Sequence, residues 1–351
     1  MGWGTGADVV PLDGKNVILV ESGLLRIRRN IAFVGINSLL TIAGKSIERC
    51  SSQDFGFIVG PRLNAAGRLD DMSIGIECLL SDDYTQALQY ATTLNQMNIQ
   101  RRQIEGEMLE QALRLLDDQI LLLDKSDSLP NALAIYDEKW HQGVVGLLAS
   151  RIKEKFHRPV IAFADAGNGE IKGSGRSIQG LHIRDVLDAV ATKHSGLIDK
   201  FGGHAMAAGL SMKKSAVQQF EKAFNEVVKR QADKEILQGV IESDGELSGS
   251  EFSLPLAEAI RNAGPWGQGF IEPLFDGEFE VLDWRVVGEK HLKMELQAED
   301  AEQSISAIAF NAPIERMKES NGYIRAAYRL DVNEFRNKKT AQLIVEYFEA
   351  I

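Results

Sequence analysis

The feature that most constrains how this chain folds is a helical pattern of unusual length. Over residues 81–116, apolar side chains recur near the 3.6-residue period of an α-helix, and Gly106 is the only glycine or proline in the run. At a rise of 1.5 Å per residue, such a helix is a rod of roughly 50 Å. Ser81 is the expected N-cap, with Asp82 and Asp83 in the first turn. This pattern predicts a rigid connector between domains; the alternative is two helices with a break between them.

Length and composition are those of an ordinary soluble protein. The chain has 351 residues, which suggests two or three domains, and 44% hydrophobic with 25% charged content is typical of globular proteins. No apolar run is long enough to span a bilayer, and the N-terminus does not resemble a signal peptide. Two cysteines, Cys50 and Cys78, provide neither a disulfide framework nor a zinc cluster. We therefore expect a cytoplasmic protein that is not bound to a membrane.

The net charge of −11 bears on partners. It argues against a protein that binds DNA through its bulk charge, because such domains are usually basic. It excludes neither a local basic groove nor a site where metal ions offset carboxylates and phosphates. The cluster of Arg26, Arg28 and Arg29 is either a solvated face or a DNA contact.

The segments on either side of the long helix have different characters. Residues 1–80 mix short apolar stretches with turns; residues 17–20 are a candidate strand and residues 24–43 contain helical stretches. Strand and helix patterns then alternate through residues 131–230, which predicts a small α/β domain. The expected strands are 132–136 and 159–163, and the expected helices are 144–156, 183–190 and 217–230.

Strand-like patterns dominate from Ile236 onward. A short helix at 255–263 interrupts them, and about five strands with one helix fit a small β-barrel such as the OB-fold, a common nucleic-acid-binding module. The expected strands are 239–243, 274–287, 291–297, 304–310, 324–335 and 341–348.

Two glycine-rich segments of the α/β region are candidate phosphate sites. They are Gly173-Ser174-Gly175-Arg176-Ser177 and Phe201-Gly202-Gly203-His204. Glycine amides in tight turns can point at an anion, and the arginine guanidinium matches phosphate oxygens. The alternative is two ordinary turns with a surface arginine.

Together with three further motifs, these segments resemble the RecJ family of DHH/DHHA1 phosphoesterases. The resemblance covers essentially the whole chain, and the order and spacing of the motifs carry it. The further motifs are Gly4-Thr5-Gly6-Ala7-Asp8, residues 60–70 (GPRLNAAGRLD) and residues 140–146 (WHQGVVG), and residues 264–275 agree.

The resemblance implies a fold and an activity. The expected activity is degradation of single-stranded DNA from the 5′ end, with release of mononucleotides, in recombination and repair. Mn²⁺ or Mg²⁺ is the implied cofactor, and single-stranded DNA is the implied partner, together with single-stranded-DNA-binding protein and a repair helicase. The implied fold class is α/β, in four parts: the end of a DHH catalytic domain (1–80), a long connecting helix (81–124), a DHHA1 domain (125–232) and an OB-fold-like β-barrel (233–351).

The chain also departs from the family pattern. The Asp-x-Asp and Asp-His-His motifs that supply most catalytic carboxylates are missing from the expected place, before the segment that ends at Asp8. The chain therefore resembles the C-terminal part of a RecJ, in which Asp8 is the one family metal ligand. A lone carboxylate cannot hold a catalytic metal pair, so we expect an incomplete site and a fragment that is inactive alone.

The resemblance assigns roles to individual residues. Asp8, His141 and His204 are the expected catalytic residues, and Asp8 is the expected metal ligand. His141 can instead cap a turn, and Arg62 or Arg68 can instead form buried ion pairs with Asp70 or Asp71. The expected substrate-binding residues are Arg62, Asn64, Arg68, Gly173, Ser174, Gly175, Arg176, Ser177, Gly202 and Gly203.

Residues of the expected barrel can also contact DNA. Aromatic side chains can stack on bases and lysines can follow the backbone, although most aromatic residues of a small barrel belong to its core. The candidates are Trp266, Phe270, Phe275, Phe335, Arg336, Lys290, Lys293, Lys338 and Lys339.

Two other functions remain open. One is a related phosphodiesterase acting on nanoRNA or cyclic dinucleotides; such enzymes usually lack a barrel like the one expected after residue 236. The other is a non-catalytic module that binds single-stranded DNA and docks partner proteins.

Overall fold

The computed structural model describes residues 4–5, 10–121, 129–288, 290–336 and 338–351. These residues form two units, each built from separate segments of the chain. We call residues 33–45 and 59–239 the sheet unit, and residues 1–32, 46–58 and 240–351 the barrel unit. Among the described residues, none of the helices combines the length and the apolar character that a membrane span requires.

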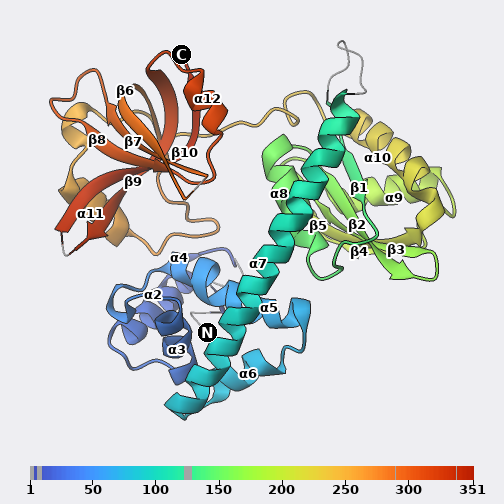
Figure 1. Cartoon of the computed structure of the whole chain (residues 1–351), viewed down its shortest axis with the longest axis horizontal. Helices are drawn as coiled ribbons and strands as arrows, with labels where there is room; N and C mark the ends of the chain where they lie inside the picture. Colours follow the sequence, from blue (N-terminus) through green and yellow to red (C-terminus); the bar gives the residue numbers. More distant parts are fainter. Residues whose placement is uncertain (1–3, 6–9, 122–128, 289, 337) are drawn as a thin grey trace. The chain divides into compact units, whose positions relative to one another are not determined.

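The long helical pattern forms one helix, α7, which runs from Tyr84 to Leu121 in the sheet unit (Figure 1). The alternative of two separate helices was wrong. The expected N-cap was also wrong, because Asp83 rather than Ser81 accepts the backbone N–H of Gln86, at 2.8 Å. The N-terminal half of α7 packs against three shorter helices, and its C-terminal half packs against α8. The three shorter helices are α3 (Val34–Ile42), α5 (Gly60–Leu69) and α6 (Ser73–Leu80).

A five-stranded mixed sheet follows α7, in the strand order β1-β2-β3-β5-β4. Strands β1 and β2 are parallel, and the other neighbouring strands are antiparallel. The strands are β1 (Leu133–Tyr136), β2 (Val160–Gly167), β3 (Glu170–Arg176), β4 (Lys200–Gly203) and β5 (Ala207–Lys213).

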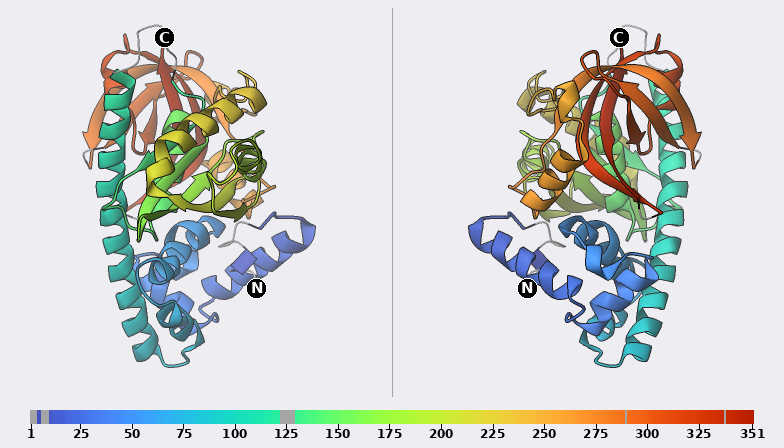
Figure 2. Two further views of the ribbon diagram at one scale, coloured as in Figure 1. Left: turned by 90° about the vertical axis from the view of Figure 1, so that its right-hand side faces the viewer. Right: turned by 90° about the vertical axis from the view of Figure 1, so that its left-hand side faces the viewer.

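Helices cover both faces of this sheet. Residues of α9 (Ile183–Lys193) and α10 (Val217–Gln231) share one hydrophobic core with it, and residues of α7 and α8 (Val145–Phe156) share a second core on the other face. Figure 1 and Figure 2 show the resulting layers. The expected helices and the first two strands of this region are confirmed. The two glycine-rich segments, however, lie mainly in strands β3 and β4, and only their last residues, Ser177 and His204, fall outside the strands.

The barrel unit contains a closed barrel with the strand order β10-β8-β7-β6-β9 (Figure 2). The expected five-stranded barrel is therefore confirmed, although residues 239–243 form no strand. The strands are β6 (Phe275–Val287), β7 (His291–Gln297), β8 (Ile305–Ala309), β9 (Tyr323–Phe335) and β10 (Lys338–Ala350), with helices α11 (Leu254–Ala263) and α12 (Ile314–Lys318) and the short turn η4 (Gly249–Glu251).

The N-terminal segments of the barrel unit are helical. The expected strand at residues 17–20 was wrong, because these residues lie in α2 (Gly14–Arg28). The side chain of Asp13 begins this helix by accepting the backbone N–H groups of Lys15 and Asn16. Two short helices, α4 (Ser52–Asp54) and the 3₁₀ turn η1 (Ile47–Arg49), and the π-helical turn η2 (Phe55–Val59) follow later in the chain.

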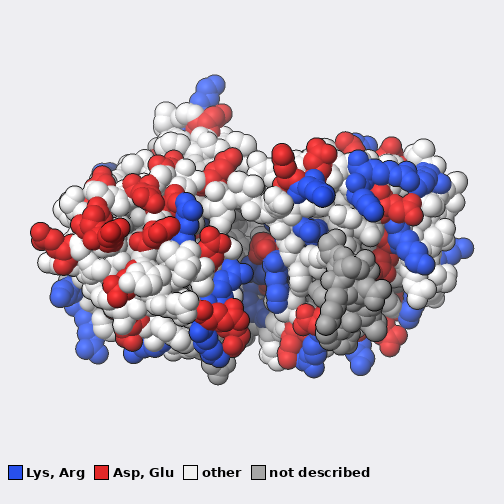
Figure 3. All heavy atoms as spheres, turned by 90° about the horizontal axis from the view of Figure 1, so that it is seen from above, with Lys and Arg blue, Asp and Glu red and all other residues white. Residues whose placement is uncertain are grey.

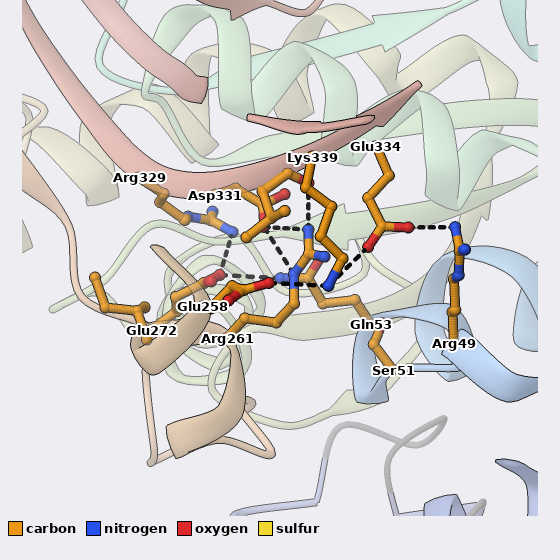
Figure 4. Close-up of polar contacts among 12 residues, drawn as sticks. Arg49, Ser51, Gln53, Glu258, Arg261, Glu272, Arg329, Asp331, Glu334 and Lys339 are labelled. Atoms are coloured by element: carbon orange, nitrogen blue, oxygen red, sulfur yellow. Dashed lines mark hydrogen bonds and ion pairs between the residues drawn. The ribbon is translucent and has the colours of Figure 1, made fainter. Parts of the chain in front are cut away.

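Polar contacts hold residues 46–58 against the barrel (Figure 4). Arg49 forms an ion pair with Glu334 of β9. Gln53 donates to Glu272 at 3.0 Å, and Arg329 of β9 lies 3.3 Å from the same carboxylate. Burial raises the pKa of Glu272, and the positive charge of Arg329 opposes that rise. The half-buried carboxylate of Glu272 thus links residues 46–58, through Gln53, to Arg329 of the barrel.

Candidate nucleic-acid interface

One face of the sheet unit gathers several of the expected site residues. On β3, the side chains of Lys172, Ser174 and Arg176 alternate with buried residues, so they share the face that α8 partly covers. In register with Ser174 lie Gly209 of β5 and, next to it, Gly202 of β4. These two glycines leave the backbone bare, because a Cβ at Gly202 would meet nothing within 4 Å and one at Gly209 would meet only a backbone oxygen at 3.9 Å.

A shallow cavity of about 390 Å³ lies over this face. Gln142 of the turn before α8 and Val145, the first residue of α8, border it on one side. Lys172 and Lys200 border it from the strands, and both are exposed and flank Ser211 of β5 in the register. The cavity therefore has a glycine-rich floor with positive charges at its edge, which is an arrangement that suits a phosphodiester backbone.

Arg176 and Ser174 lie against the first turn of α8. A Cβ built on Gly146 would lie 3.0 Å from Nη2 of Arg176 and 3.4 Å from Oγ of Ser174. Nη1 of Arg176 donates to the carbonyl oxygen of Gly175 at 2.8 Å. A helix N-terminus carries partial positive charge and backbone N–H groups, so it favours an anion at this point. The guanidinium, the hydroxyl and the helix terminus therefore converge on one small region.

Arginines of α5 and α7 extend this positive region. Burial lowers the pKa of Arg176, and the nearby positive charge of Arg68 lowers it further. Burial likewise lowers the pKa of Arg62, with Arg102 of α7 as the second cause. Burial lowers the pKa of Arg101 too; Glu105 opposes that effect, while Arg102 and Arg68 add to it. Arginine side chains stay protonated at neutral pH. The fold therefore holds several positive charges close to one another.

Arg101 has clear structural partners in this group. It donates to Glu105 at 2.6 Å and to Asn98 at 3.0 Å, and Glu105 also accepts from Arg151 of α8 at 3.0 Å. This buried carboxylate joins the middle of α7 to α8, so it fixes the position of the arginines relative to the sheet. Arg101 and Arg102 were not among the predicted site residues. The pair of adjacent arginines in the middle of the long helical pattern could have indicated a basic site.

The α5 helix separates the three residues expected to act together. Nε of Arg62 donates to Asn95 of α7 at 3.0 Å, while Asn64 is exposed on another side of the helix. Nη1 of Arg68 donates to the carbonyl oxygen of Gly143 at 3.1 Å. Asp71, offered above as an ion-pair partner, instead accepts the N–H and hydroxyl of Ser73 at the start of α6. Arg62 and Arg68 thus contact different neighbours.

His141 has the structural contact that was the alternative to a catalytic role. Its Nδ1 accepts the backbone N–H of Gly143 at 3.1 Å, which caps the turn before α8. The neutral tautomer therefore carries its proton on Nε2, on the exposed side chain. Gly143 also touches α5, because a Cβ there would lie 2.2 Å from the carbonyl oxygen of Arg68. The turn that carries His141 is thereby fixed to the C-terminal end of α5.

The glycines of β3 have a packing role. A Cβ at Gly173 would lie 2.6 Å from the ring of Phe163, and one at Gly175 would lie 2.8 Å from Ile183. Both positions point away from the Ser174 face and into the core. Ser177 is also inside, since only 1% of it is exposed and its hydroxyl donates to the carbonyl oxygen of Leu181 at 2.6 Å.

Gly203 and His204 form the turn between β4 and β5. Gly203 has a φ of +146°, and a Cβ there would lie 2.4 Å from the carbonyl oxygen of Ala207. His204 is exposed, and its backbone N–H donates to the same oxygen at 2.8 Å. The second glycine segment thus shapes a hairpin at the edge of the sheet. Its histidine follows the end of β4 and lies outside the pair of side-chain-free positions, Gly202 and Gly209.

The expected metal ligand, Asp8, lies outside the described residues. Within the described ranges, no three His, Cys, Asp or Glu side chains lie together in a way that could hold a metal ion. The donor set of the described residues therefore does not fit a divalent metal.

The barrel aromatics fall into two groups. Trp266 and Phe275 pack against the barrel core, and the Trp266 indole N–H donates to the carbonyl oxygen of Ile260 at 3.0 Å. Phe335 is 65% exposed at the end of β9, with the guanidinium of Arg336 5.1 Å from the centre of its ring. Phe270 is exposed to a smaller extent. Lys339, in contrast, forms an ion pair with Glu258 at 2.9 Å.

Comparisons with known proteins agree with this architecture. Residues 129–230 match the family model described as the DHHA1 domain, and residues 243–347 match the RecJ OB domain. The chain is 51% identical over 346 residues to the single-stranded-DNA-specific exonuclease RecJ of Dickeya dadantii, and 49% identical over 346 residues to that of Escherichia coli. Each alignment covers 98% of this chain and 59% of the relative. The chain thus spans about three fifths of the length of these relatives.

Solved structures show the same fold. The structure of RecJ in complex with Mg²⁺ from Thermus thermophilus matches with a TM-score of 0.79 at 26% identity, over 100% of this chain and 51% of that one. The corresponding complex with Mn²⁺ matches with a TM-score of 0.78 at 27% identity, over 100% of this chain and 49% of that one. The chain therefore belongs to the RecJ family, with the DHHA1 and OB domains in that order.

Proposed function

We propose that the protein containing this chain is an exonuclease that degrades single-stranded DNA from the 5′ end, and that the sheet unit grips the terminal phosphate. The observation that carries this proposal is the convergence of Arg176, Ser174 and the first turn of α8 at Gly146, with Arg68 close by. A doubly charged terminal phosphate would relieve the repulsion between these arginines and accept several charge-assisted hydrogen bonds. A phosphodiester inside a strand carries less charge and would bind less well.

The remaining residues have supporting roles in this proposal. Lys172 and Lys200 attract the following phosphates, and the bare row at Gly209 and Gly202 lets the backbone approach the sheet. Arg62 and Arg102 lie farther along α5 and α7, where they contact the next nucleotides. His141, next to the cavity residue Gln142, and His204, in the turn after β4, remain our candidates for contact with the scissile phosphate. Gly173 and Gly175 support the face by packing, and Ser177 by its hydrogen bond inside the domain.

The barrel unit supplies a second contact with the strand. Phe335 and Arg336, at the β9–β10 turn, present an exposed ring beside a positive charge, which suits stacking on unpaired bases. Exposed Lys338 follows in the chain. Lys and Arg side chains also form groups of their own on the face drawn in Figure 3, so the negative net charge leaves room for locally positive surface.

Other parts of the proposal rest on the resemblance and on the relatives. Mn²⁺ or Mg²⁺ is the proposed cofactor of the full-length enzyme, since the Thermus thermophilus RecJ structures were solved with these ions. We propose the boundaries 1–80, 81–124, 125–232 and 233–351 for the four domains. Two buried free thiols, Cys50 and Cys78, support a cytoplasmic location. Single-stranded-DNA-binding protein and a repair helicase are the proposed protein partners.

One observation favours a non-catalytic role for this chain when it is isolated. Its described residues hold no group that fits a metal, whereas they do form the cavity that we propose for phosphate. We therefore expect the isolated chain to bind single strands without cutting them. The closed barrel and its match to the RecJ OB domain argue against a phosphodiesterase of nanoRNA or cyclic dinucleotides.

The test compares Arg176→Ala with Arg184→Ala, an exposed arginine on α9, in the full-length protein. The substrates are one oligonucleotide with a 5′-phosphate and the same oligonucleotide with a 5′-hydroxyl, each degraded with Mn²⁺ present. Loss of a contact with a charged group costs about 1.5–3 kcal/mol, so Arg176→Ala should lower kcat/KM on the phosphorylated strand at least tenfold. The preference for phosphate over hydroxyl should shrink by the same factor. An unchanged preference would refute the assignment.

A further inference from the structure

A second cavity, of about 650 Å³, lies in the barrel unit and has the opposite charge character. It lies between the segment before η4, the start of β6, the end of β7 and the middle of β9. Four carboxylates line it, and among the described residues no Lys or Arg side chain does. They are Glu246, Glu278, Glu299 and Asp300, and all four are exposed.

Aromatic rings line the same cavity. Phe252, Phe279 and Tyr328 form a cluster with ring centres 5.4 to 6.0 Å apart. Gly277 of β6 packs beside two of these rings, since a Cβ there would lie 3.4 Å from the Phe279 ring and 3.8 Å from that of Tyr328, and both rings are buried. Aromatic faces attract cations through the ring quadrupole, and the neighbouring carboxylates act in the same direction.

The hydroxyl of Tyr328 is buried; the backbone of Leu247 lies near enough to act on it as a hydrogen-bond partner, but not in a geometry that satisfies the hydroxyl. Tyr328 is 0% exposed, yet it is one of the residues that line the cavity. Burial raises the pKa of this hydroxyl above its usual range; the backbone of Leu247 opposes that rise, and the charges of Asp276, Glu246 and Glu251 add to it. The hydroxyl is therefore neutral at physiological pH. An unsatisfied buried polar group is costly, so its presence at a cavity wall points to a ligand that completes it.

Nearby groups leave the cavity acidic. Asp300 accepts the backbone N–H of Gly249 at 2.9 Å, and Arg325 is bound to Asp276 at 3.0 Å. Arg325 also faces Glu278 in the strand register and offsets part of its charge. Glu246 and Glu299 lie in segments outside the strands, and both are exposed.

We propose that this cavity binds a lysine or arginine side chain of a basic segment in a partner protein. The carboxylates hold the charge, the partly exposed ring of Phe252 contacts the apolar stem, and the Tyr328 oxygen at the cavity wall accepts an N–H. A DNA strand is repelled by the same carboxylates, so the barrel separates a DNA-binding turn at Phe335 from a protein-docking cavity. No three acidic groups among the described residues are placed to hold a metal ion, which argues against a metal occupant.

The experiment measures fluorescence anisotropy of a labelled, capped hexalysine peptide bound to the complete chain. The triple variant Glu246→Gln/Glu278→Gln/Glu299→Gln is compared with the control Glu170→Gln/Glu235→Gln/Glu319→Gln, which removes three exposed carboxylates elsewhere. Each exposed charge contact contributes little alone, so loss of all three in the cavity variant should weaken binding about tenfold. The control should weaken it less than about twofold, the part that general attraction contributes.

Tyr328→Phe separates the aromatic pocket from the charges. It removes one oxygen and keeps the ring, so the fold should be retained with an unchanged or higher melting temperature. Loss of one hydrogen bond should weaken the peptide about fivefold. Equal weakening by the cavity and control triples would overturn the proposal, since that result means binding by net charge alone. Spermidine binding as tightly as the peptide would also overturn it, in favour of a small polyamine.

Discussion

The guanidinium of Arg176 occupies the space in which a side chain at position 146 would stand. The distance between Nη2 of Arg176 and a Cβ built on Gly146 is 3.0 Å, shorter than a relaxed contact. A strand residue and a helix residue thirty positions apart are therefore matched to each other. Glycine at the first turn of α8 is what allows the arginine to lie beside the helix N-terminus.

Gly146→Ala should consequently weaken binding of a 5′-phosphorylated oligonucleotide without destabilising the protein. The added methyl group displaces only the far end of a flexible side chain, and alanine has a higher helix propensity than glycine. Moving one charged contact should cost about 1.4 kcal/mol, or tenfold in Kd. Anisotropy with a labelled 5′-phosphorylated single strand measures the change in affinity.

Gly106→Ala is the matched control for that variant. Gly106 is exposed on α7, and a Cβ there would meet nothing within 4 Å. The control should raise stability by up to about 1 kcal/mol and leave DNA affinity unchanged. Equal DNA affinity in both variants would show that the position of Arg176 beside α8 does not matter for binding.

Neighbouring glycines of β4 should respond in opposite ways to substitution. Gly203 has a φ of +146° and lies against the backbone of Ala207, so Gly203→Ala requires the hairpin to shift. We expect it to lose about 2 kcal/mol or more of stability, because its clash is with backbone. Gly202→Ala meets open space and should leave stability nearly unchanged, while its methyl group stands on the proposed DNA face and weakens binding about twofold to fivefold. Urea unfolding and anisotropy on both variants distinguish the two effects.

These contrasts show what the sequence could and could not predict. The 3.6-residue period over α7 depends only on local spacing, so one long helix was predicted correctly. Apolar and polar side chains likewise alternate along β7 and much of β9, and this pattern indicates a strand with one buried face. The prediction that Gly173 and Gly175 lie in turns was wrong. These positions require glycine because a side chain would collide with Phe163 or Ile183, which belong to other elements. No local pattern reports such a contact.

The candidate site was predictable in the same partial way. Arg176 and Arg68 were both identified from their motifs, but their proximity depends on how α5 meets the turn at Gly143. Arg101 and Arg102 were missed because a basic pair on a long helix usually faces solvent. Their electrostatic coupling to Arg68 and Arg62 arises from the packing of α5 on α7.

Glu272 should make the barrel unit less stable as the pH rises. Burial raises the pKa of its carboxyl in the folded state, so folding favours the protonated form. This stabilisation is fully present below the ordinary pKa of glutamate, about 4.3, and is lost as the pH rises through the higher folded value. Glu272→Gln mimics the protonated form, so the variant should be at least as stable as the wild type at pH 8.

The measurement is urea unfolding of wild type and Glu272→Gln at pH 4 and pH 8. The advantage of the variant should shrink toward pH 4, where the wild-type carboxyl is increasingly protonated. Glu280→Gln, at an exposed position of β6, is the control and should show no comparable dependence on pH. A variant that is much less stable at pH 8 would mean that the contacts of Glu272 with Arg329 and Gln53 outweigh its burial.

The salt dependence of DNA binding should identify which arginines contact phosphate. Each neutralised phosphate of a single strand contributes about 0.7 to the slope of log K against log salt concentration. Arg176→Ala and Arg68→Ala should each lower the magnitude of that slope by about 0.7, while Arg184→Ala should leave it unchanged. Arg176→Lys should restore the slope but not the full affinity, because lysine keeps the charge and lacks the planar fork. An unchanged slope in Arg68→Ala would mean that Arg68 acts only through its hydrogen bond to Gly143, as a structural link between α5 and the turn before α8.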